Sequence, residues 1–162
     1  MNTIPNPMSR LRILVAAGLI GLAVLLVLHV RGRAAEDKVR ETVLKVLDDQ
    51  VEAWNQGNLE GFMKGYWKSD DLTFFSGGDV QQGWQATFDR YKARYQGEGK
   101  EMGKLKFEDR KVDATGPKTA LVRGRWELTF KDGKKIGGLY TLLMREERQG
   151  WCIVHDHTSK AD

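Results

Sequence analysis

Two histidines stand at alternate positions near the end of the chain, within the strand-like run at residues 151–158. Successive side chains of a strand point to opposite faces of a sheet, so His155 and His157 are expected to share one face. An imidazole exchanges protons near neutral pH, which makes this pair a candidate for acid–base chemistry. The alternative is a structural role, in which the two rings complete a strand end and bond to Asp156 or to the backbone.

Neither a metal nor a cofactor is expected from the sequence. A His-x-His pair on a strand can bind zinc, but no convincing third protein ligand accompanies it. Cys152 is the only cysteine, which excludes an intramolecular disulfide and a CxxC metal site. The glycine pairs at 77–78 and 137–138 do not precede a helix with the lysine and hydroxyl of a phosphate-binding loop.

Hydrophobic periodicity predicts the elements that must position these histidines. Helices are predicted at residues 36–56, 59–67 and 84–95, and strands at residues 72–76, 105–112, 119–130, 136–145 and 151–158. Helices first and antiparallel strands after them indicate an α+β fold. The glycines at 137–138 are expected to mark a bulge that curves the sheet.

The expected turn lengths predict which strand side chains share a face of the sheet. Asp132-Gly133 is a two-residue hairpin signal, which would place Arg125 opposite Tyr140. A four-residue turn at 147–150 would then bring the two histidines to the same face. A slip of one residue would reverse either assignment. That shared face carries Leu121, Arg123, Arg125, Glu127, Tyr140, Leu142, Met144, His155 and His157.

The N-terminal 33 residues differ in composition from the rest. Ile13 to Val30 is apolar all round apart from His29, and arginines flank it on both sides. This length suits a membrane-spanning helix or a secretory signal peptide, with residues 32–34 as a possible cleavage site. We expect residues 1–33 to be an uncleaved membrane anchor or a signal peptide, and residues 34–162 to form one extracytoplasmic domain.

The charge pattern argues against nucleic-acid binding. The chain has 26 basic and 22 acidic residues, and four of the arginines lie in the first 33 residues, which contain no acid. The remaining domain therefore carries 22 residues of each sign. The basic balance belongs to the N-terminal segment, and no aromatic-interleaved basic stripe indicates a nucleic-acid surface.

Several short motifs resemble the SnoaL-like proteins of the nuclear transport factor 2-like superfamily, whose relatives include ketosteroid isomerase and scytalone dehydratase. The motifs are Trp54-Asn55-x-Gly57-Asn58-Leu59-x-x-Phe62, Gly83-Trp84, Gly124-Arg125-Trp126 and Gly150-Trp151-x-Ile153-Val154-His155-Asp156-His157-Thr158-Ser159. The resemblance covers Glu36 to Ser159. It implies a cystatin-like cone, in which a curved antiparallel sheet wraps three helices after one apolar N-terminal helix. It also implies a blind, mostly apolar pocket, and a homodimer in many members.

The resemblance also places individual residues. It puts Tyr66 on a pocket tyrosine of the family. It also puts the face shared by Arg125, Glu127, Tyr140, His155 and His157 on the pocket side. It puts Gln50, Ser76 and Tyr140 where ketosteroid isomerase has its oxyanion tyrosine, its base carboxylate and its protonated acid. A serine without a base of its own cannot abstract a carbon-bound proton, which argues against that isomerisation route. Tyr140 remains a candidate oxyanion donor.

The remaining candidates are charged and aromatic. Arg125 and Glu127 would anchor a ligand carboxylate, or else form an ion pair at the rim. Tyr66 and Trp84 belong to an aromatic set that lines the pocket or simply fills the core. Together the expected ligand-binding residues are Tyr66, Trp84, Arg125, Glu127, Tyr140, His155 and His157.

Three functions are consistent with these residues. The first is binding of a small, mostly apolar organic ligand by an exported domain. The second is an isomerase, cyclase or dehydratase that uses His155 or His157 with Tyr140 as the catalytic residues. The third is a non-catalytic dimerisation module, because one scaffold of this kind hosts many functions. The expected partners are a small molecule, a second copy of the chain and, without cleavage, a membrane.

Overall fold

The computed structural model describes residues 7–161, and it describes side chains from residue 25 onward. The chain divides into two compact units, one ending at Asp37 and the other beginning at Lys38. Helix α1 spans Pro7–Asn55 and covers the helix predicted at residues 36–56 except for its last residue.

The predicted apolar segment, Ile13 to Val30, falls within α1. Its side chains as far as Val24 lie outside the described residues. In the part of the chain that the structure describes, no helix is both long and apolar enough to cross a membrane. Export, membrane anchoring and cleavage therefore stay predictions.

Sequence signals account for where the helices of the second unit lie. The last turns of α1 bury Val43, Leu47, Gln50 and Trp54, which recur at three- and four-residue steps. Asn58 caps α2, Leu59–Met63, because its side-chain oxygen accepts a hydrogen bond of 2.8 Å from the Gly61 N–H. Helix α2 is shorter than predicted, whereas α3, Trp84–Tyr95, has the predicted bounds.

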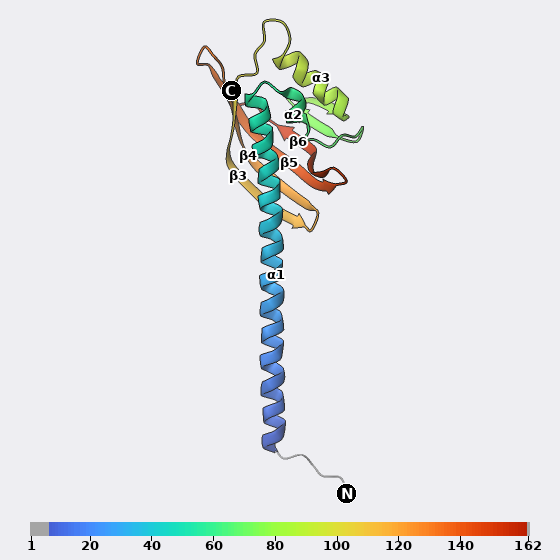
Figure 1. The fold of residues 1–162 in the computed structure, drawn as a ribbon, viewed down its shortest axis with the longest axis vertical. Helices are drawn as coiled ribbons and strands as arrows, with labels where there is room; N and C mark the ends of the chain where they lie inside the picture. Colours follow the sequence, from blue (N-terminus) through green and yellow to red (C-terminus); the bar gives the residue numbers. More distant parts are fainter. Residues whose placement is uncertain (1–6, 162) are drawn as a thin grey trace. The chain divides into compact units, whose positions relative to one another are not determined.

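Six strands form one sheet, drawn as arrows in Figure 1. The strands are β1 Thr73–Ser76, β2 Asp79–Gln82, β3 Lys104–Gly116, β4 Thr119–Thr129, β5 Lys135–Glu147 and β6 Gly150–Thr158. Their order across the sheet is β2-β1-β6-β5-β4-β3. The last turns of α1, helices α2 and α3, and the inner face of this sheet enclose the buried core. The α+β prediction is confirmed.

The prediction of a wholly antiparallel sheet is wrong, because β1 runs parallel to β6. The sequence reading also missed β2, a short strand that pairs antiparallel with β1 at the sheet edge. Gly77 and Gly78 both adopt positive φ, 64° and 84°, which closes this hairpin. Strand β2 is largely exposed and lacks apolar alternation, so nothing in its pattern predicted it.

The turn of the β4–β5 hairpin has three residues, one more than the two-residue turn predicted from Asp132-Gly133. The Phe130 N–H bonds to the Lys134 carbonyl, and three residues lie between them. Arg125 therefore pairs with Leu139 rather than with Tyr140, and Gly124 pairs with Tyr140. This single-residue shift moves the odd-numbered residues of β4 to the outer face, and it places Ala120, Val122, Gly124, Trp126 and Leu128 inside.

The β5–β6 hairpin has the predicted turn but contains a bulge. Glu147 pairs with Gly150 and Met144 with Ile153, whereas Leu143 pairs with His155. Val154 is the extra residue, and it reverses the facing of everything after it. Asp156 and Thr158 consequently face the core, and His155 and His157 face away from it.

Gly137 and Gly138 do not form the expected bulge, because their pairing with β4 is regular. Gly138 serves close packing instead: a Cβ atom there would lie 1.9 Å from the Ser159 carbonyl oxygen. The segment after β6 lies against this glycine. It is held by hydrogen bonds from the Ser159 N–H to the Leu139 carbonyl, 2.9 Å, and from the Ala161 N–H to the Gly137 carbonyl, 2.8 Å.

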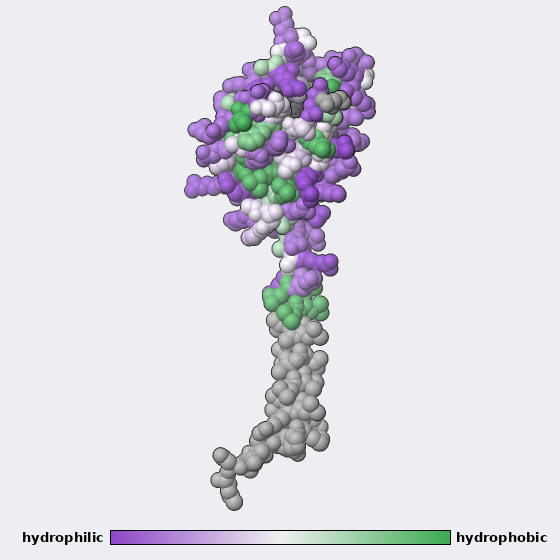
Figure 2. All heavy atoms as spheres, turned by 180° about the vertical axis from the view of Figure 1, so that it is seen from behind, coloured by the Kyte–Doolittle hydropathy of each residue, from purple (hydrophilic) through white to green (hydrophobic). Residues whose placement is uncertain are grey.

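The surface of the second unit is largely hydrophilic, with small groups of hydrophobic side chains on the side shown in Figure 2. On the outer face of β5, Leu139 and Leu143 are 52% and 39% exposed. A second copy covering this face, as the predicted homodimer requires, stays a prediction.

Candidate functional site

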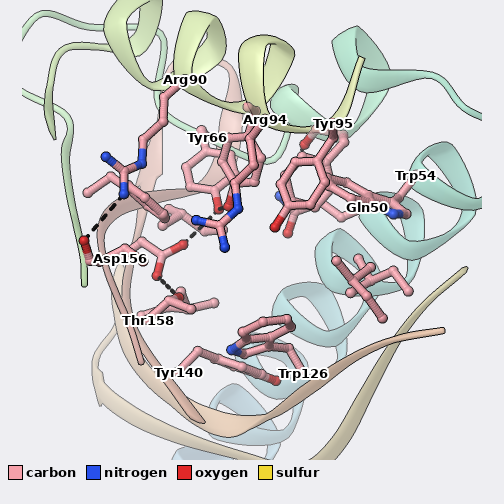
Figure 3. A pocket seen from close by; sticks show the side chains of 18 of the residues that line it. Gln50, Trp54, Tyr66, Arg90, Arg94, Tyr95, Trp126, Tyr140, Asp156 and Thr158 are labelled. Carbon is pink, nitrogen blue, oxygen red and sulfur yellow. Dashed lines mark hydrogen bonds between the residues drawn. The ribbon is translucent and has the colours of Figure 1, made fainter. Parts of the chain in front are cut away.

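A cavity of about 200 Å³ lies between the helices and the inner face of the sheet. Figure 3 shows side chains from α1, α3, β4, β5 and β6 converging on it. A volume below the roughly 300–1,000 Å³ of typical drug-sized pockets suits a ligand of one or two rings. The apolar residues of the lining include Leu105, Leu128, Leu142 and Ile153.

Aromatic rings form most of the wall between the helices. The Trp54 ring makes edge contacts with Phe62 and Tyr95, each with centroids 4.9 Å apart. The indole N–H of Trp54 is bonded to the Met102 carbonyl at 3.1 Å, which fixes the ring. These rings offer a flat, apolar and rigid surface to a ligand.

Asp156 carries the one buried carboxylate of the cavity lining. Its Oδ2 accepts a hydrogen bond from the Tyr66 hydroxyl at 2.7 Å, and its Oδ1 accepts one from Thr158 Oγ1 at 2.6 Å. Burial raises the pKa of Asp156 to about 6, and the two hydrogen bonds oppose that rise. A carboxyl group with a pKa near neutrality can accept or release a proton.

Two further polar groups of the lining have no hydrogen-bond partner among the described residues: the Tyr140 hydroxyl and the Gln50 side-chain oxygen. Burial raises the pKa of Tyr140 to about 12, so its hydroxyl remains a proton donor. The Gln50 amide is oriented by its N–H, which donates to the Phe62 carbonyl at 3.0 Å. Its oxygen is therefore left as an acceptor without a donor.

Glycines make room for both groups. A Cβ atom on Gly65 would lie 2.5 Å from the side-chain carbon Cδ of Gln50, and one on Gly124 would lie 2.4 Å from the Tyr140 hydroxyl oxygen. Neither glycine has a positive φ. Space for the neighbouring polar side chain, and not backbone conformation, therefore accounts for these glycines.

Basic side chains lie at the rim of the cavity, from α3 and from the segment after β6. Arg90 donates hydrogen bonds to Asp79 at 3.0 Å and to the Ser76 carbonyl at 3.3 Å. The Arg94 guanidinium lies 5.6 Å from the centre of the Tyr95 ring. Lys160 completes the basic part of the lining.

Some of the predicted site residues do meet at this cavity. Tyr66 and Tyr140 line it, as do Gln50 and Ser76, the residues that the family resemblance placed at isomerase positions. The placement of these four in the pocket is confirmed, whereas their roles remain untested.

The two histidines are not in the cavity lining, so the prediction of a pocket face for them is wrong. His155 Nδ1 lies 2.6 Å from Thr73 Oγ1, and its ring packs edge-on against Phe75 with centroids 4.8 Å apart. Burial, and then the neighbouring His157, lower the pKa of His155. The bulge at Val154 is the physical reason that the histidines lie outside the cavity, because it turns Asp156 inward in their place.

Arg125 and Glu127 are also outside the cavity, because the β4–β5 register turns them outward. Arg125 pairs with Asp109 at 3.4 Å, and Glu127 pairs with Lys135 at 2.8 Å. The hydrogen bond from Lys135 lowers the pKa of Glu127. Neither residue is positioned to anchor a ligand in the cavity.

Trp84 is a core residue and does not line the cavity. It stacks on Phe88 with centroids 5.3 Å apart, and its indole N–H donates to the Met63 carbonyl at 3.1 Å. Cys152 is buried as expected, and burial raises the pKa of its thiol to about 11. Within the residues that the structure describes, no group of His, Cys, Asp and Glu side chains is arranged to hold a metal ion.

The sequence reading missed Asp156, Arg90, Arg94 and Lys160. The inward orientation of Asp156 depends on the bulge at Val154, which the sequence pattern does not show. A signal for the arginines was available, because Arg90 and Arg94 stand four residues apart on α3, each directly before a tyrosine. Such a helix presents an aromatic row and a cationic row side by side.

Comparisons with known proteins agree with this fold. The sequence pattern described as the SnoaL-like domain matches residues 43–162. A protein of unknown function from Shewanella oneidensis, described as NTF-2 like, is 33% identical over 74% of this chain and 98% of its own, with a TM-score of 0.69. No curated protein sequence matches the chain.

More distant structures share the fold alone. A nuclear transport factor 2-like superfamily protein from Salmonella enterica is 16% identical over 78% of this chain and 93% of its own, with a TM-score of 0.65. A ketosteroid isomerase-like protein from Erwinia carotovora atroseptica is 20% identical over 75% of this chain and 95% of its own, with a TM-score of 0.61. At these identities the likeness carries no functional residue across.

Proposed function

Because the chain belongs to the SnoaL-like domain family, we propose that its second unit binds a small, mostly apolar organic molecule in the aromatic-lined cavity. The ligand places a flat, apolar body between the rings of α1, α2 and α3 and the inner face of the sheet. A polar group of the ligand reaches Tyr140 or Gln50 at the inner wall. The family hosts several activities, so the proposal rests on the site and not on the fold.

The buried Tyr140 hydroxyl is the observation that carries this proposal. A buried polar group without a partner costs about 1–3 kcal/mol of folding stability. Tyr140 is only 4% exposed, and none of the described residues bonds to its hydroxyl. A phenylalanine would fill the same space without that cost. A ligand hydroxyl or carbonyl that pairs with Tyr140 accounts for the retained oxygen.

Replacing Tyr140 with phenylalanine is expected to raise stability and weaken binding at the same time. The free energy of unfolding should rise by about 1 kcal/mol, because an unpaired buried hydroxyl is removed. Affinity for a small aromatic alcohol such as 2-naphthol should fall about fivefold, the equivalent of one neutral hydrogen bond. Urea denaturation and calorimetric titration measure the two quantities.

Tyr66→Phe is the matched control for this variant. The Tyr66 hydroxyl has a partner, Asp156, so its removal should lower stability by about 1.5–3 kcal/mol. Opposite signs for the two tyrosines support the proposal. A loss of stability in Tyr140→Phe as large as in Tyr66→Phe would mean that Tyr140 has a structural partner, and the proposal would lose its basis.

Asp156 favours a second candidate function, proton transfer to or from the bound molecule. Its carboxyl group lines the cavity, and burial raises its pKa to about 6. In its ionised form it is a suitable base for a carbon-bound proton beside a carbonyl group, with Tyr140 as a donor to the carbonyl oxygen. This differs from the histidine-based route that the sequence suggested.

A simple ketone tests this candidate. If the domain transfers protons, it should accelerate deuterium exchange from D2O into the α-carbons of 2-tetralone, as measured by proton NMR. Asp156→Asn should abolish the acceleration, whereas Asp71→Asn, which changes an exposed carboxylate outside the cavity lining, should leave it unchanged. Equal exchange in the wild type and Asp156→Asn would exclude Asp156 as the base.

A further inference from the structure

The ionisable residues of the cavity lining are unbalanced in charge. Apart from the tyrosines they comprise three basic residues, Arg90, Arg94 and Lys160, and one acid, Asp156. Asp156 is buried on the inner side, where Tyr66 and Thr158 bond to it. The charge on the exposed side of the cavity is therefore positive.

Arg90 already has partners within the protein, so it is not the main group for binding a ligand. Its guanidinium is paired with Asp79 at 3.0 Å, bonds to the Ser76 carbonyl at 3.3 Å, and lies 5.8 Å from the centre of the Phe74 ring. These contacts hold the side chain in place and neutralise its charge. Arg90 fixes one side of the rim.

Arg94 differs from Arg90 in this respect. Among the residues that the structure describes, no carboxylate lies within ion-pair distance of its guanidinium, and the side chain is exposed. Figure 3 shows it reaching from α3 over the cavity, between Tyr95 and Asp156. Its planar fork of N–H donors matches the two oxygens of a carboxylate.

Lys160 adds a second positive charge from a fixed backbone. The residues on either side of it donate hydrogen bonds to β5, at the Leu139 and Gly137 carbonyls. The Trp126 indole N–H bonds to the Ser159 carbonyl at 3.0 Å, which ties the same segment to β4. Although the Lys160 side chain is exposed, its backbone is positioned at the cavity.

We infer that the molecule bound in this cavity is an organic acid, whose aromatic or cyclic body fills the cavity and whose carboxylate pairs with Arg94, supported by Lys160. This inference rests on the proposed binding function and names the class of ligand. An apolar body alone leaves the rim charges without a role. An acid uses the apolar wall together with the Arg94 guanidinium, for which the described residues supply no carboxylate partner.

Matched pairs of acids and amides test the inference, because they differ in charge and hardly in shape. The probes are benzoate with benzamide and 2-naphthoate with 2-naphthamide, titrated calorimetrically into the full chain at neutral pH. The acid of a pair should bind about 10- to 100-fold more tightly than its amide, the range for one charged hydrogen-bonded pair. Added salt should weaken binding of the acid more than binding of the amide.

Two variants test whether the preference for acid over amide arises from Arg94 at the rim. Arg94→Gln should lower acid affinity far more than amide affinity and reduce the preference for the acid to less than about threefold. Arg148→Gln is the control, because it removes an exposed arginine that does not line the cavity and should keep the full preference. Thermal denaturation of both variants checks that they are folded.

The outcomes separate the two proposals. Equal affinity of acid and amide in the wild type overturns the organic-acid inference and leaves the binding function intact. An equal loss of acid and amide affinity in Arg94→Gln also overturns it, because Arg94 would then shape the cavity without recognising charge. If no acid and no amide binds, the binding function itself fails.

Discussion

Asp156→Asn is expected to stabilise the protein by about 3 kcal/mol at neutral pH and to have little effect near pH 4. The carboxyl group is buried, and burial raises its pKa from 3.8 to about 6. Between these two values the folded protein holds a proton that the unfolded chain has released. Wild-type stability should therefore fall as pH rises through this window and stay at the lower level above it.

The asparagine variant cannot ionise and should lack this part of the pH dependence. Its oxygen can still accept from Tyr66, and its amide can donate to Thr158, so the local hydrogen bonds survive. Urea denaturation at a series of pH values measures the difference between the two proteins, and contributions from all other groups cancel. Ser76→Ala, another change in the cavity lining, should run parallel to the wild type.

A constant difference between Asp156→Asn and the wild type from pH 4 to pH 7 would contradict this account. So would a variant that is less stable than the wild type at pH 7. Either result would mean that Asp156 is better solvated or better paired than its surroundings indicate, and its suitability as a base near neutrality would disappear.

Gly124→Ala is expected to destabilise the protein by about 1–3 kcal/mol, the usual cost of an overpacked site. The added methyl group would lie 2.4 Å from the Tyr140 hydroxyl oxygen and 2.9 Å from the Glu108 carbonyl. The Tyr140 ring cannot easily move, because it is buried against Phe107 with centroids 5.1 Å apart. Displacement of the hydroxyl should also weaken 2-naphthol binding.

The sign of this effect is informative. In a strand without a special contact, Ala in place of Gly should stabilise by roughly 0.5–1 kcal/mol, because the unfolded chain loses freedom. Denaturant unfolding decides between the two directions. A combined Gly124→Ala, Tyr140→Leu variant should show that the alanine costs less once the tyrosine is gone. A stabilising Gly124→Ala would show that Tyr140 does not need this glycine.

Much of the fold could be predicted from local sequence signals. The periodicity at residues 84–95 gave the bounds of α3, and the long alternating runs located β4, β5 and β6. The family resemblance predicts that Gln50, Ser76, Tyr66 and Tyr140 share one pocket, and all four line the cavity. These predictions succeed because periodicity and motif spacing are properties of the chain that need no knowledge of register.

The facing of the strands could not be predicted in the same way. The Asp132-Gly133 signal located the β4–β5 turn but not its length, and the extra residue turned Arg125 and Glu127 outward. Val154 looks like an ordinary strand residue, yet it is the bulge that brings Asp156 inside in place of His155 and His157. Both errors are shifts of one residue, which local sequence does not determine.

Methyl NMR during titration with 2-naphthoate tests the central claim most directly, because the leucines of β5 report on both faces of the sheet. Leu142 lines the cavity, whereas Leu139 and Leu143 are exposed on the outer face. Binding in the cavity should shift the methyl signals of Leu142 and Ile153 and leave those of Leu139 and Leu143 in place. Shifts confined to Leu139 and Leu143, or no shifts at all, would contradict a ligand-binding cavity.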